Sequence, residues 1–525
     1  MLTRISALVV LSVLLVLGQA KPLAAQEPDK SEKSDKDKDK DKDAKPAPEP
    51  KEESSVTDHT IKIGTQTIAY KATASTTLIK DDKGEPTASI FTIAYTRSDV
   101  KDMGQRPISF VYNGGPGSSS IWLHMGAFGP RRVVTTDAGP TPPPPFKLVD
   151  NADCLLDKTD LVFVDPVGTG FSRAVGKAKD KDFWGIDQDV KSLAQLIATY
   201  ISRNGRWNSP KFLIGESYGT FRSAALGNYL QQHNGMYFNG IDLISSVLDL
   251  GTISFPPGND MPYIFYLPSY AATASYHKML KDQPADLNAF LAEARQFASG
   301  EYATALMKGA TISAADKADI AKKVSRFTGL SDDYIIKADL RVNLPQFMVE
   351  LQRSRKLSTG RLDARFSGPS PDLLAEYADY DPQSTAVEGA FVAAFNSYVR
   401  EDLKFGKDLT YNTMAEDAGR QWDWKRPGHD QDYGFPGAPN VEADLVQALV
   451  TNPHLHVEVE NGLYDLATPF FATEFTMTHL GLPENMQKNI TLQYYDAGHM
   501  MYLHEADLSK LKTNVAAFLD NATKQ

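Results

Sequence analysis

A serine stands between two glycines in residues 215–219, which read Gly-Glu-Ser-Tyr-Gly. An apolar run at 212–214 leads into this pentapeptide, and a helical pattern at 220–232 follows it. A serine on so sharp a turn from strand to helix holds its hydroxyl clear of the backbone, and the helix N-terminus favours negative charge on an attacked carbonyl. The glycines are required because the neighbouring elements leave no room for a Cβ atom. The spacing therefore predicts that Ser217 is a nucleophile rather than an incidental turn serine.

A nucleophilic serine needs a base within hydrogen-bond reach and an acidic group that orients the base. When the serine lies on a strand-to-helix turn, the acid and then the histidine follow it along the chain. His499 lies just past an expected strand at 490–495, and Asp465 lies just past another at 455–459. We therefore expect Ser217, Asp465 and His499 to form a catalytic triad. The alternative is that Asp465 or His499 is only a structural residue of its turn.

Residues 113–120, Asn-Gly-Gly-Pro-Gly-Ser-Ser-Ser, form a loop of small residues after an expected strand at 108–112. The backbone amides of such a loop can point at a ligand and stabilise negative charge on an attacked carbonyl oxygen. Taken alone, the segment could equally be a plain surface loop. Its place upstream of residues 215–219 favours an oxyanion hole.

His454, His456 and Glu458 alternate along the chain and would share one face of a strand, as metal ligands can. No further ligand is indicated. A peripheral strand with one solvent-facing side produces the same alternation. We therefore expect neither a metal site nor a cofactor.

Strands and helices alternate along the chain around these residues, as they do in a parallel sheet with helices on both faces. Alternating residues over 60–95 predict antiparallel strands that open the sheet. The rest of the pattern comprises strands at 108–112, 161–164, 212–214 and 241–248, helices at 187–201 and 220–232, a return to the sheet at 445–459, a last strand at 490–495 and a closing helix at 508–519. The sequence therefore predicts an α/β fold with a mostly parallel central sheet.

Mainly helical signatures interrupt the sheet over residues 261–405. This region is predicted to be a helical cap insertion over the catalytic face. It divides the core into two parts, at 56–260 and 406–525. Because the chemical candidates lie outside the insertion, we expect it to shape substrate access rather than chemistry.

The N-terminal residues are predicted to be targeting and linker segments. Residues 1–25 combine a positive start, a short apolar run and small residues, which is typical of a secretory signal peptide. Residues 26–55 alternate Asp and Lys and are rich in proline, so we expect a disordered charged linker. The protein is therefore predicted to be secreted, to a periplasm or outside the cell.

The composition of the 525 residues limits the classes of partner. A formal net charge of −11 offers no basic surface for nucleic acid. After signal cleavage no apolar segment of membrane-spanning length remains, so we expect no membrane association. Cys154 is the only cysteine, which excludes an intramolecular disulfide, and it is expected to be a buried apolar residue. The oligomeric state is left open.

Four segments together resemble the serine carboxypeptidase family, peptidase family S10. They are the loop at 113–120, the stretch at 165–172, the pentapeptide at 215–219 and the run Ala-Gly-His-Met at 497–500. The resemblance covers most of the chain after about Val56. It implies an α/β-hydrolase fold, whose core would comprise 56–260 and 406–525, and removal of C-terminal residues from peptides.

The resemblance also implies roles for individual residues. Ser217, Asp465 and His499 match the family's triad, and the backbone amides of Gly115 and Tyr218 match its oxyanion hole.

Three further residues, Asn113, Gly114 through its amide, and Glu216, would hold the terminal carboxylate of the substrate by the same resemblance. Neutral donors and a carboxylic acid that keeps its proton suit this task, because they add no negative charge. One position departs from the family pattern: Ala127 stands where a second glutamate usually partners the one before the serine.

These residues predict a secreted serine carboxypeptidase-like hydrolase that acts on peptides with a free C-terminus through an acyl-enzyme on Ser217. An esterase or an acyltransferase on the same triad is a second hypothesis. A catalytically silent binding protein on a hydrolase fold is a third, and the three intact triad candidates argue against it.

Overall fold

The computed structural model describes residues 49–426 and 438–524. The signal peptide expected at 1–25 and most of the linker expected at 26–55 lie outside these residues. The first strand, β1, begins at Ser54, inside the last residues of the expected linker. Its opening residues are polar or half-exposed, so their side chains carry no apolar alternation that would reveal a strand.

Ten of the described strands form one mixed sheet, in the order β1-β2-β3-β7-β4-β9-β10-β13-β14 with β8 paired to β3. β1, β2 and β3 are antiparallel, as the alternation over 60–95 predicts, and β3 is also antiparallel to β7. From β7 to β14 all neighbouring strands are parallel, so the mostly parallel sheet is confirmed. The strands are β1 (Ser54–Ile63), β2 (Gln66–Lys80), β3 (Pro86–Arg97), β4 (Ile108–Tyr112), β7 (Asp160–Val164), β8 (Arg173–Ala174), β9 (Lys211–Glu216), β10 (Gly240–Ile244), β13 (His456–Gly462) and β14 (Ile490–Tyr495).

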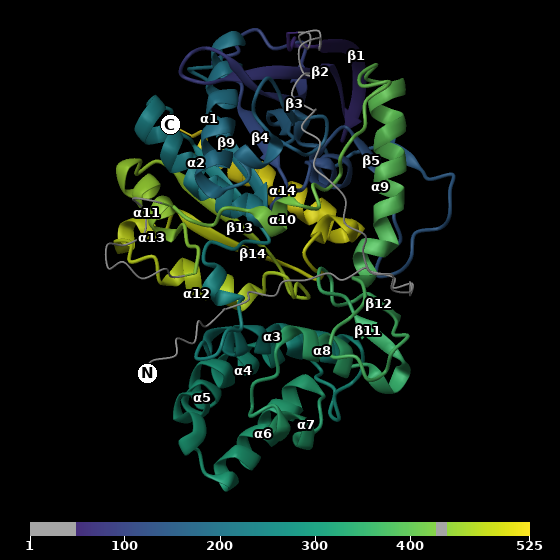
Figure 1. The fold of residues 1–525 in the computed structure, drawn as a ribbon, viewed down its shortest axis with the longest axis vertical. Helices are drawn as coiled ribbons and strands as arrows, with labels where there is room; N and C mark the ends of the chain where they lie inside the picture. The colour runs from purple at the N-terminus through teal and green to yellow at the C-terminus, as the bar shows by residue number, and fades with distance from the viewer. Residues whose placement is uncertain (1–48, 427–437, 525) are drawn as a thin grey trace, which may run out of the picture. The chain divides into compact units, whose positions relative to one another are not determined.

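Helices cover both faces of the parallel strands (Figure 1). On one face, buried side chains of β9, β10 and β13 pack with α1 (Ile186–Arg203), α2 (Tyr218–Asn234) and α11 (Glu442–Thr451). On the other face, side chains of β9 and β10 share a cluster with α9 (Pro382–Glu401) and α14 (Glu505–Ala522). The remaining short elements of the core are β5 (Arg131–Val133), β6 (Leu148–Asp150), α10 (Ala418–Gln421), α12 (Phe470–Thr478) and α13 (Glu484–Gln487). Within the described ranges, no helix has both the length and the apolar character that a membrane crossing requires.

Two boundaries near the site differ from the sequence-based expectation. β10 ends at Ile244 rather than at residue 248, because Ser245 has a φ of 52° and leaves the extended conformation. The return to the sheet expected at 445–459 is partly the helix α11, and the strand itself begins at His456.

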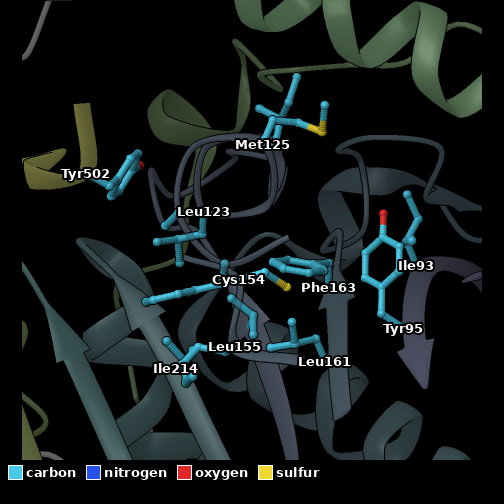
Figure 2. Packing of buried hydrophobic residues seen from close by; sticks show 14 of the residues in the cluster. Ile93, Tyr95, Leu123, Met125, Cys154, Leu155, Leu161, Phe163, Ile214 and Tyr502 are labelled. Carbon is cyan, nitrogen blue, oxygen red and sulfur yellow. The ribbon is translucent and has the colours of Figure 1, made fainter. Parts of the chain in front are cut away.

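Cys154 is buried in the cluster that contains α9 and α14. It lies with Leu155 and Phe163 in this packing (Figure 2). Burial raises the pKa of its thiol to about 12, so the side chain behaves as a small apolar residue, as expected.

The helices of the insertion lie apart from the sheet (Figure 1). Their apolar side chains form a further cluster, which also contains Leu463, Tyr464, Leu466 and Phe470. The elements of the insertion are α3 (Met261–Tyr276), α4 (Leu287–Phe297), α5 (Ala303–Lys308), α6 (Ala314–Thr328), α7 (Asp332–Lys337), α8 (Leu344–Glu350) and the paired strands β11 (Leu357–Thr359) and β12 (Ser367–Pro369). α9 differs, because Phe391 and Phe395 pack with the sheet and α14 although residues 382–401 were expected in the insertion. An apolar helix face does not reveal which core it will cover, so the sequence could not separate α9 from the helices before it.

Three carboxyl groups are buried side by side on β10 and β13. Asp242 pairs with Glu458 across the two strands, and Glu460 follows on the same face of β13. The expectation that this face meets solvent is wrong, because β13 lies between β10 and β14 and α14 packs over it. In the part of the chain that the structure describes, no three His, Cys, Asp or Glu side chains are placed to hold a metal ion.

These carboxyl groups have few hydrogen-bond donors. Gln493 donates to Glu458 at 3.1 Å and Tyr495 donates to Glu460 at 2.7 Å. Both carboxyl oxygens of Asp242 lack a partner among the described residues. Burial raises the pKa of Glu458 to about 7, and it raises the pKa values of Asp242 and Glu460 well above their ordinary range.

Replacing Asp242 with asparagine is expected to stabilise the protein at neutral pH. Aspartate ionises near pH 4 in an unfolded chain, whereas burial holds the pKa of Asp242 well above that value in the folded protein. The free energy of unfolding therefore falls as the pH rises from about 4 towards the raised pKa, because the unfolded chain releases the proton first. The melting temperature of D242N should exceed that of the wild type by roughly 2–4 °C at pH 7 and by little at pH 4.

Thermal unfolding followed by circular dichroism at the two pH values measures this difference. Asp82→Asn, in an exposed turn, is the matched control and should leave both melting temperatures unchanged. A D242N effect of equal size at pH 4 and pH 7 would contradict the prediction.

Candidate active site

Ser217 lies on the turn between β9 and α2, with φ 60° and ψ −127°. This is a strained conformation for a residue that has a Cβ atom. A Cβ on Gly215 would collide with the carbonyl of Gly219, and a Cβ on Gly219 would lie 3.0 Å from the carbonyl oxygen of Tyr112. The strand, the sharp turn and the helix expected around Ser217 are therefore confirmed, and so is the steric need for the two glycines.

His499 and Asp465 are buried together at the ends of the next parallel strands. The Asp465 carboxylate lies 2.7 Å from His499 Nδ1. It also accepts hydrogen bonds from the Ala467 amide at 2.7 Å and from the Thr468 amide at 2.9 Å and hydroxyl at 2.7 Å. Burial lowers the pKa of His499, but the neighbouring Asp465 outweighs this effect, so the pKa is raised overall.

The serine turn and the histidine loop meet at the end of β10. The Ser217 amide donates to the Ile244 carbonyl at 2.9 Å, and the Ser245 hydroxyl donates to the His499 carbonyl at 2.7 Å. Among the described residues the His499 ring bonds only through Nδ1, to Asp465 and Thr468. Among the described residues no hydrogen bond joins the Ser217 hydroxyl to His499, so their pairing stays a prediction, and such contacts often tighten only when a ligand binds.

The glycine-rich loop after β4 lies directly against the serine turn. A Cβ on Gly114 would collide with the amide nitrogen of Tyr218, so only glycine permits this approach. Gly115 has a φ of 103°, which again favours glycine. The Ser120 amide and hydroxyl both donate to Asp165 at 2.8 Å, which ties the loop to the end of β7. The backbone amides of two separate segments are thus held close together.

A buried ion pair also contacts the loop at 113–120, and it was not predicted from the sequence. Arg222 donates through Nε to Asp189 at 2.6 Å and through Nη1 to the Asn113 carbonyl at 2.6 Å. A buried charge needs a partner, and Arg222 is the only charged residue in the helical pattern 220–232. This single charge in an otherwise uncharged helix could have indicated a buried ion pair.

Glu216 and Asn113 are in contact beside the nucleophile candidate. Glu216 is 4% exposed, and its Oε1 accepts a hydrogen bond from Asn113 Nδ2 at 2.8 Å. The Leu123 amide donates to Asn113 Oδ1 at 3.1 Å, which fixes the orientation of the amide group. Burial raises the pKa of Glu216 to about 7, against smaller lowering effects of His499 and the hydrogen bonds.

The second oxygen of Glu216 has a partner that the sequence analysis missed. The Tyr502 hydroxyl donates to Glu216 Oε2 at 2.7 Å. Tyr502 belongs to the 3-10 turn η8 (Met501–Leu503), which directly follows the histidine loop. In the sequence, the hint of such a partner was Ala127, which stands where the family usually has a second glutamate. A buried Glu216 carboxyl without that glutamate needs another hydrogen-bond partner.

The insertion contacts the histidine loop through its backbone. The His499 amide donates to the Leu362 carbonyl at 2.6 Å, and the Leu466 amide donates to the Arg361 carbonyl at 3.0 Å. Residues of the insertion therefore help to hold the loops that carry Asp465 and His499. The expectation that the insertion shapes substrate access rather than chemistry stays a prediction.

Comparison with known proteins identifies the family. Residues 84–355, slightly over half of the chain, match the family model of the serine carboxypeptidases, peptidase S10. Two curated relatives are the pheromone-processing carboxypeptidase KEX1 of Saccharomyces cerevisiae strains S288c and JAY291. Each is 27% identical over 161 residues, which represent 29% of this chain and 21% of the relative. The alignment thus spans about a fifth of the length of these relatives.

One solved structure shows the same architecture, and a second is less similar. KEX1(delta)p, a prohormone-processing carboxypeptidase from Saccharomyces cerevisiae, has a TM-score of 0.55 at 17% identity, over 86% of this chain and 91% of that one. A proline iminopeptidase from Mycobacterium smegmatis has a TM-score of 0.35 at 13% identity, over 89% of this chain and 99% of that one. From the family match and the KEX1(delta)p architecture, the chain belongs to the serine carboxypeptidase family and has an α/β-hydrolase fold.

Proposed function

We propose that this protein is a secreted serine carboxypeptidase that releases C-terminal residues from peptides. The observation that carries the proposal is the buried carboxyl of Glu216, directly before Ser217, with a pKa raised to about 7. While neutral, this group can donate a hydrogen bond to the terminal carboxylate of a substrate. Family membership and the relative named as a pheromone-processing carboxypeptidase support the same activity.

In the proposed first step, the Ser217 hydroxyl oxygen attacks the carbonyl carbon of the last peptide bond. His499 Nε2 takes the hydroxyl proton, and Asp465 holds the charged imidazole in place. The amides of Gly115 and Tyr218 donate to the negative oxygen that forms. His499 then gives its proton to the leaving nitrogen, the C–N bond breaks, and an acyl-enzyme remains on Ser217.

In the second step, water takes the place of the departed amine. His499 removes a proton from the water as its oxygen attacks the acyl carbon. The ester bond to Ser217 breaks, and His499 returns the proton to the serine oxygen. The same residues therefore serve both halves of the reaction, without a metal or a cofactor.

The terminal carboxylate is proposed to bind Asn113, the Gly114 amide and Glu216. A peptide places its carboxylate there only when it ends one residue beyond the bond that Ser217 attacks. This arrangement would restrict cleavage to the last residue. The helices of the proposed cap insertion, 261–405, would shape access to this position.

One observation favours a second candidate function. Ala127 supplies no carboxyl beside Glu216, so recognition of a free C-terminus rests on one acidic group. Weaker selection for a carboxylate suits an esterase or an acyltransferase on the same triad. Comparison of a free peptide with its C-terminal amide separates the two functions.

Ser217 should be the only serine that reacts covalently with a fluorophosphonate. Replacing it with alanine should lower kcat on the order of a million-fold, as removal of a triad serine does. Mass spectrometry of the labelled protein and turnover of a peptide substrate check the two effects. Ser299→Ala, at an exposed position of the insertion, is the matched control. Labelling of a different serine, or turnover without labelling, would favour a differently built site, and the absence of both labelling and turnover would favour a silent binding protein.

Glu216 should give the preference for free C-termini a specific pH dependence. Its pKa is raised, so the carboxyl is neutral below about pH 7 and charged above it. Because only the neutral form can donate, the ratio of kcat/KM for a peptide to that for its C-terminal amide should fall by up to about tenfold per pH unit above 7. The titration of His499 affects both substrates and cancels in the ratio.

Glu216→Gln should flatten this ratio, because glutamine stays neutral and keeps a donor. Glu388→Gln, on the exposed side of α9, is the matched control and should retain the wild-type profile. If the pH profiles of kcat/KM for the free peptide and its C-terminal amide coincide in the wild type, Glu216 does not bind a carboxylate. That result would favour the esterase or acyltransferase hypothesis.

Secretion is proposed from the composition of residues 1–25. Mature exported protein should begin between Ala20 and Gln26, because small residues follow the short apolar run there. N-terminal sequencing of the exported protein checks this, and an intact Met1 would contradict it.

A further inference from the structure

Each carboxyl oxygen of Glu216 has one side-chain donor of its own. Asn113 Nδ2 donates to Oε1 at 2.8 Å, and the Tyr502 hydroxyl donates to Oε2 at 2.7 Å. The two donors are far apart in the sequence. One lies in the loop after β4 and the other in the turn after His499. Together they fix the plane of the Glu216 carboxyl before any substrate arrives.

The ring of Tyr502 is closely fitted to its surroundings. It lies near the turn η1 (Leu123–Phe128), as Figure 2 shows for Leu123. A Cβ on Gly126 would approach the Tyr502 ring to 2.6 Å, so the ring position requires glycine there. The next residue, Ala127, carries only a methyl group. The phenol of Tyr502 is thus held by packing where its hydroxyl donates to Glu216 Oε2.

We propose that Tyr502 is a positioning residue for the carboxylate site: its hydroxyl orients Glu216 towards the C-terminus of the substrate and sets the pH range of carboxylate recognition. This inference rests on the proposed carboxypeptidase function. Tyr502 acts through Glu216 rather than on the reacting atoms.

A tyrosine affects Glu216 differently from an acidic neighbour. A hydroxyl that donates to a carboxylate stabilises the charged form and lowers the pKa of the acid, whereas a second carboxylate would raise it by repulsion. Burial and the neighbouring Glu216 raise the pKa of Tyr502 well above its ordinary value, so the phenol remains a neutral donor. The bond to Tyr502 thus lowers the pKa of Glu216 from the higher value that burial alone would give.

Few other charges face Glu216. His499 lowers its pKa and Asp465 raises it, and both would remain in any variant of Tyr502. Arg222, which donates to the Asn113 carbonyl, is paired with Asp189. The loss of the Tyr502 hydroxyl should therefore change the pKa of Glu216 in a defined direction, separately from the effects of His499 and Asp465.

Tyr502→Phe keeps the ring and removes only the hydroxyl. Loss of a donor to the charged carboxyl should raise the pKa of Glu216, so the fall in the ratio of kcat/KM for acid to amide should move to higher pH by about one unit. The acid-to-amide ratio at low pH should also fall about three- to tenfold, because the Glu216 carboxyl is less well oriented. Hydrolysis of the amide should be nearly unchanged.

Tyr495→Phe is the matched control. Its hydroxyl donates to a different buried glutamate, Glu460, at the same 2.7 Å distance. This variant should retain the wild-type pH profile of the acid-to-amide ratio. Fluorophosphonate labelling of Ser217 in every variant establishes that the triad is intact.

A second variant tests the opposite direction. Incorporation of 3,5-difluorotyrosine at position 502 provides a stronger donor of similar size, which should lower the pKa of Glu216 and move the fall in the ratio to lower pH. The proposal is overturned if neither change moves the profile, if both move it the same way, or if Y502F slows acid and amide equally. A wild-type ratio that is independent of pH would instead remove the carboxypeptidase proposal itself, which distinguishes the two failures.

Discussion

The site depends on backbone segments that approach more closely than side chains would allow. Ser217 holds φ 60° between β9 and α2, and Gly215 and Gly219 leave the space that this turn needs. Gly114 then brings the loop after β4 against the amide of Tyr218. The Ser217 turn and the backbone amides beside it are thus held in place by sheet and helix packing, which is the arrangement that the proposed reaction needs.

Two carboxyl groups near this turn have contrasting surroundings, which suit them to different tasks. Asp465 accepts hydrogen bonds from two amides and a hydroxyl and contacts His499, so its charge is well solvated by the protein. Within the described ranges Glu216 has two neutral side-chain donors, and burial raises its pKa to about 7. The first environment favours a fixed negative partner for an imidazole, and the second favours an acid that can keep its proton.

Local patterns were enough to predict β4, β14 and the turn at Ser217, because each depends on residues that are neighbours in sequence. Contacts between distant segments were not predictable in this way. Tyr502 lies 286 residues from Glu216, and nothing local to either residue indicates their hydrogen bond. The face of β13 was misjudged for the same reason: alternating charged residues look alike whether water or α14 covers them.

The insertion and the loop that carries His499 are joined by backbone hydrogen bonds. Asp381, at the start of α9, accepts hydrogen bonds from the amides of Arg361 and Leu362 at 2.7 and 3.0 Å. The Leu362 carbonyl in turn accepts from the His499 amide at 2.6 Å. Residues 361 and 362 are therefore hydrogen-bonded both to the start of α9 and to the loops that carry Asp465 and His499. A displacement of this segment would therefore also move the loop that carries His499, so the position of the His499 side chain depends on the packing of the insertion.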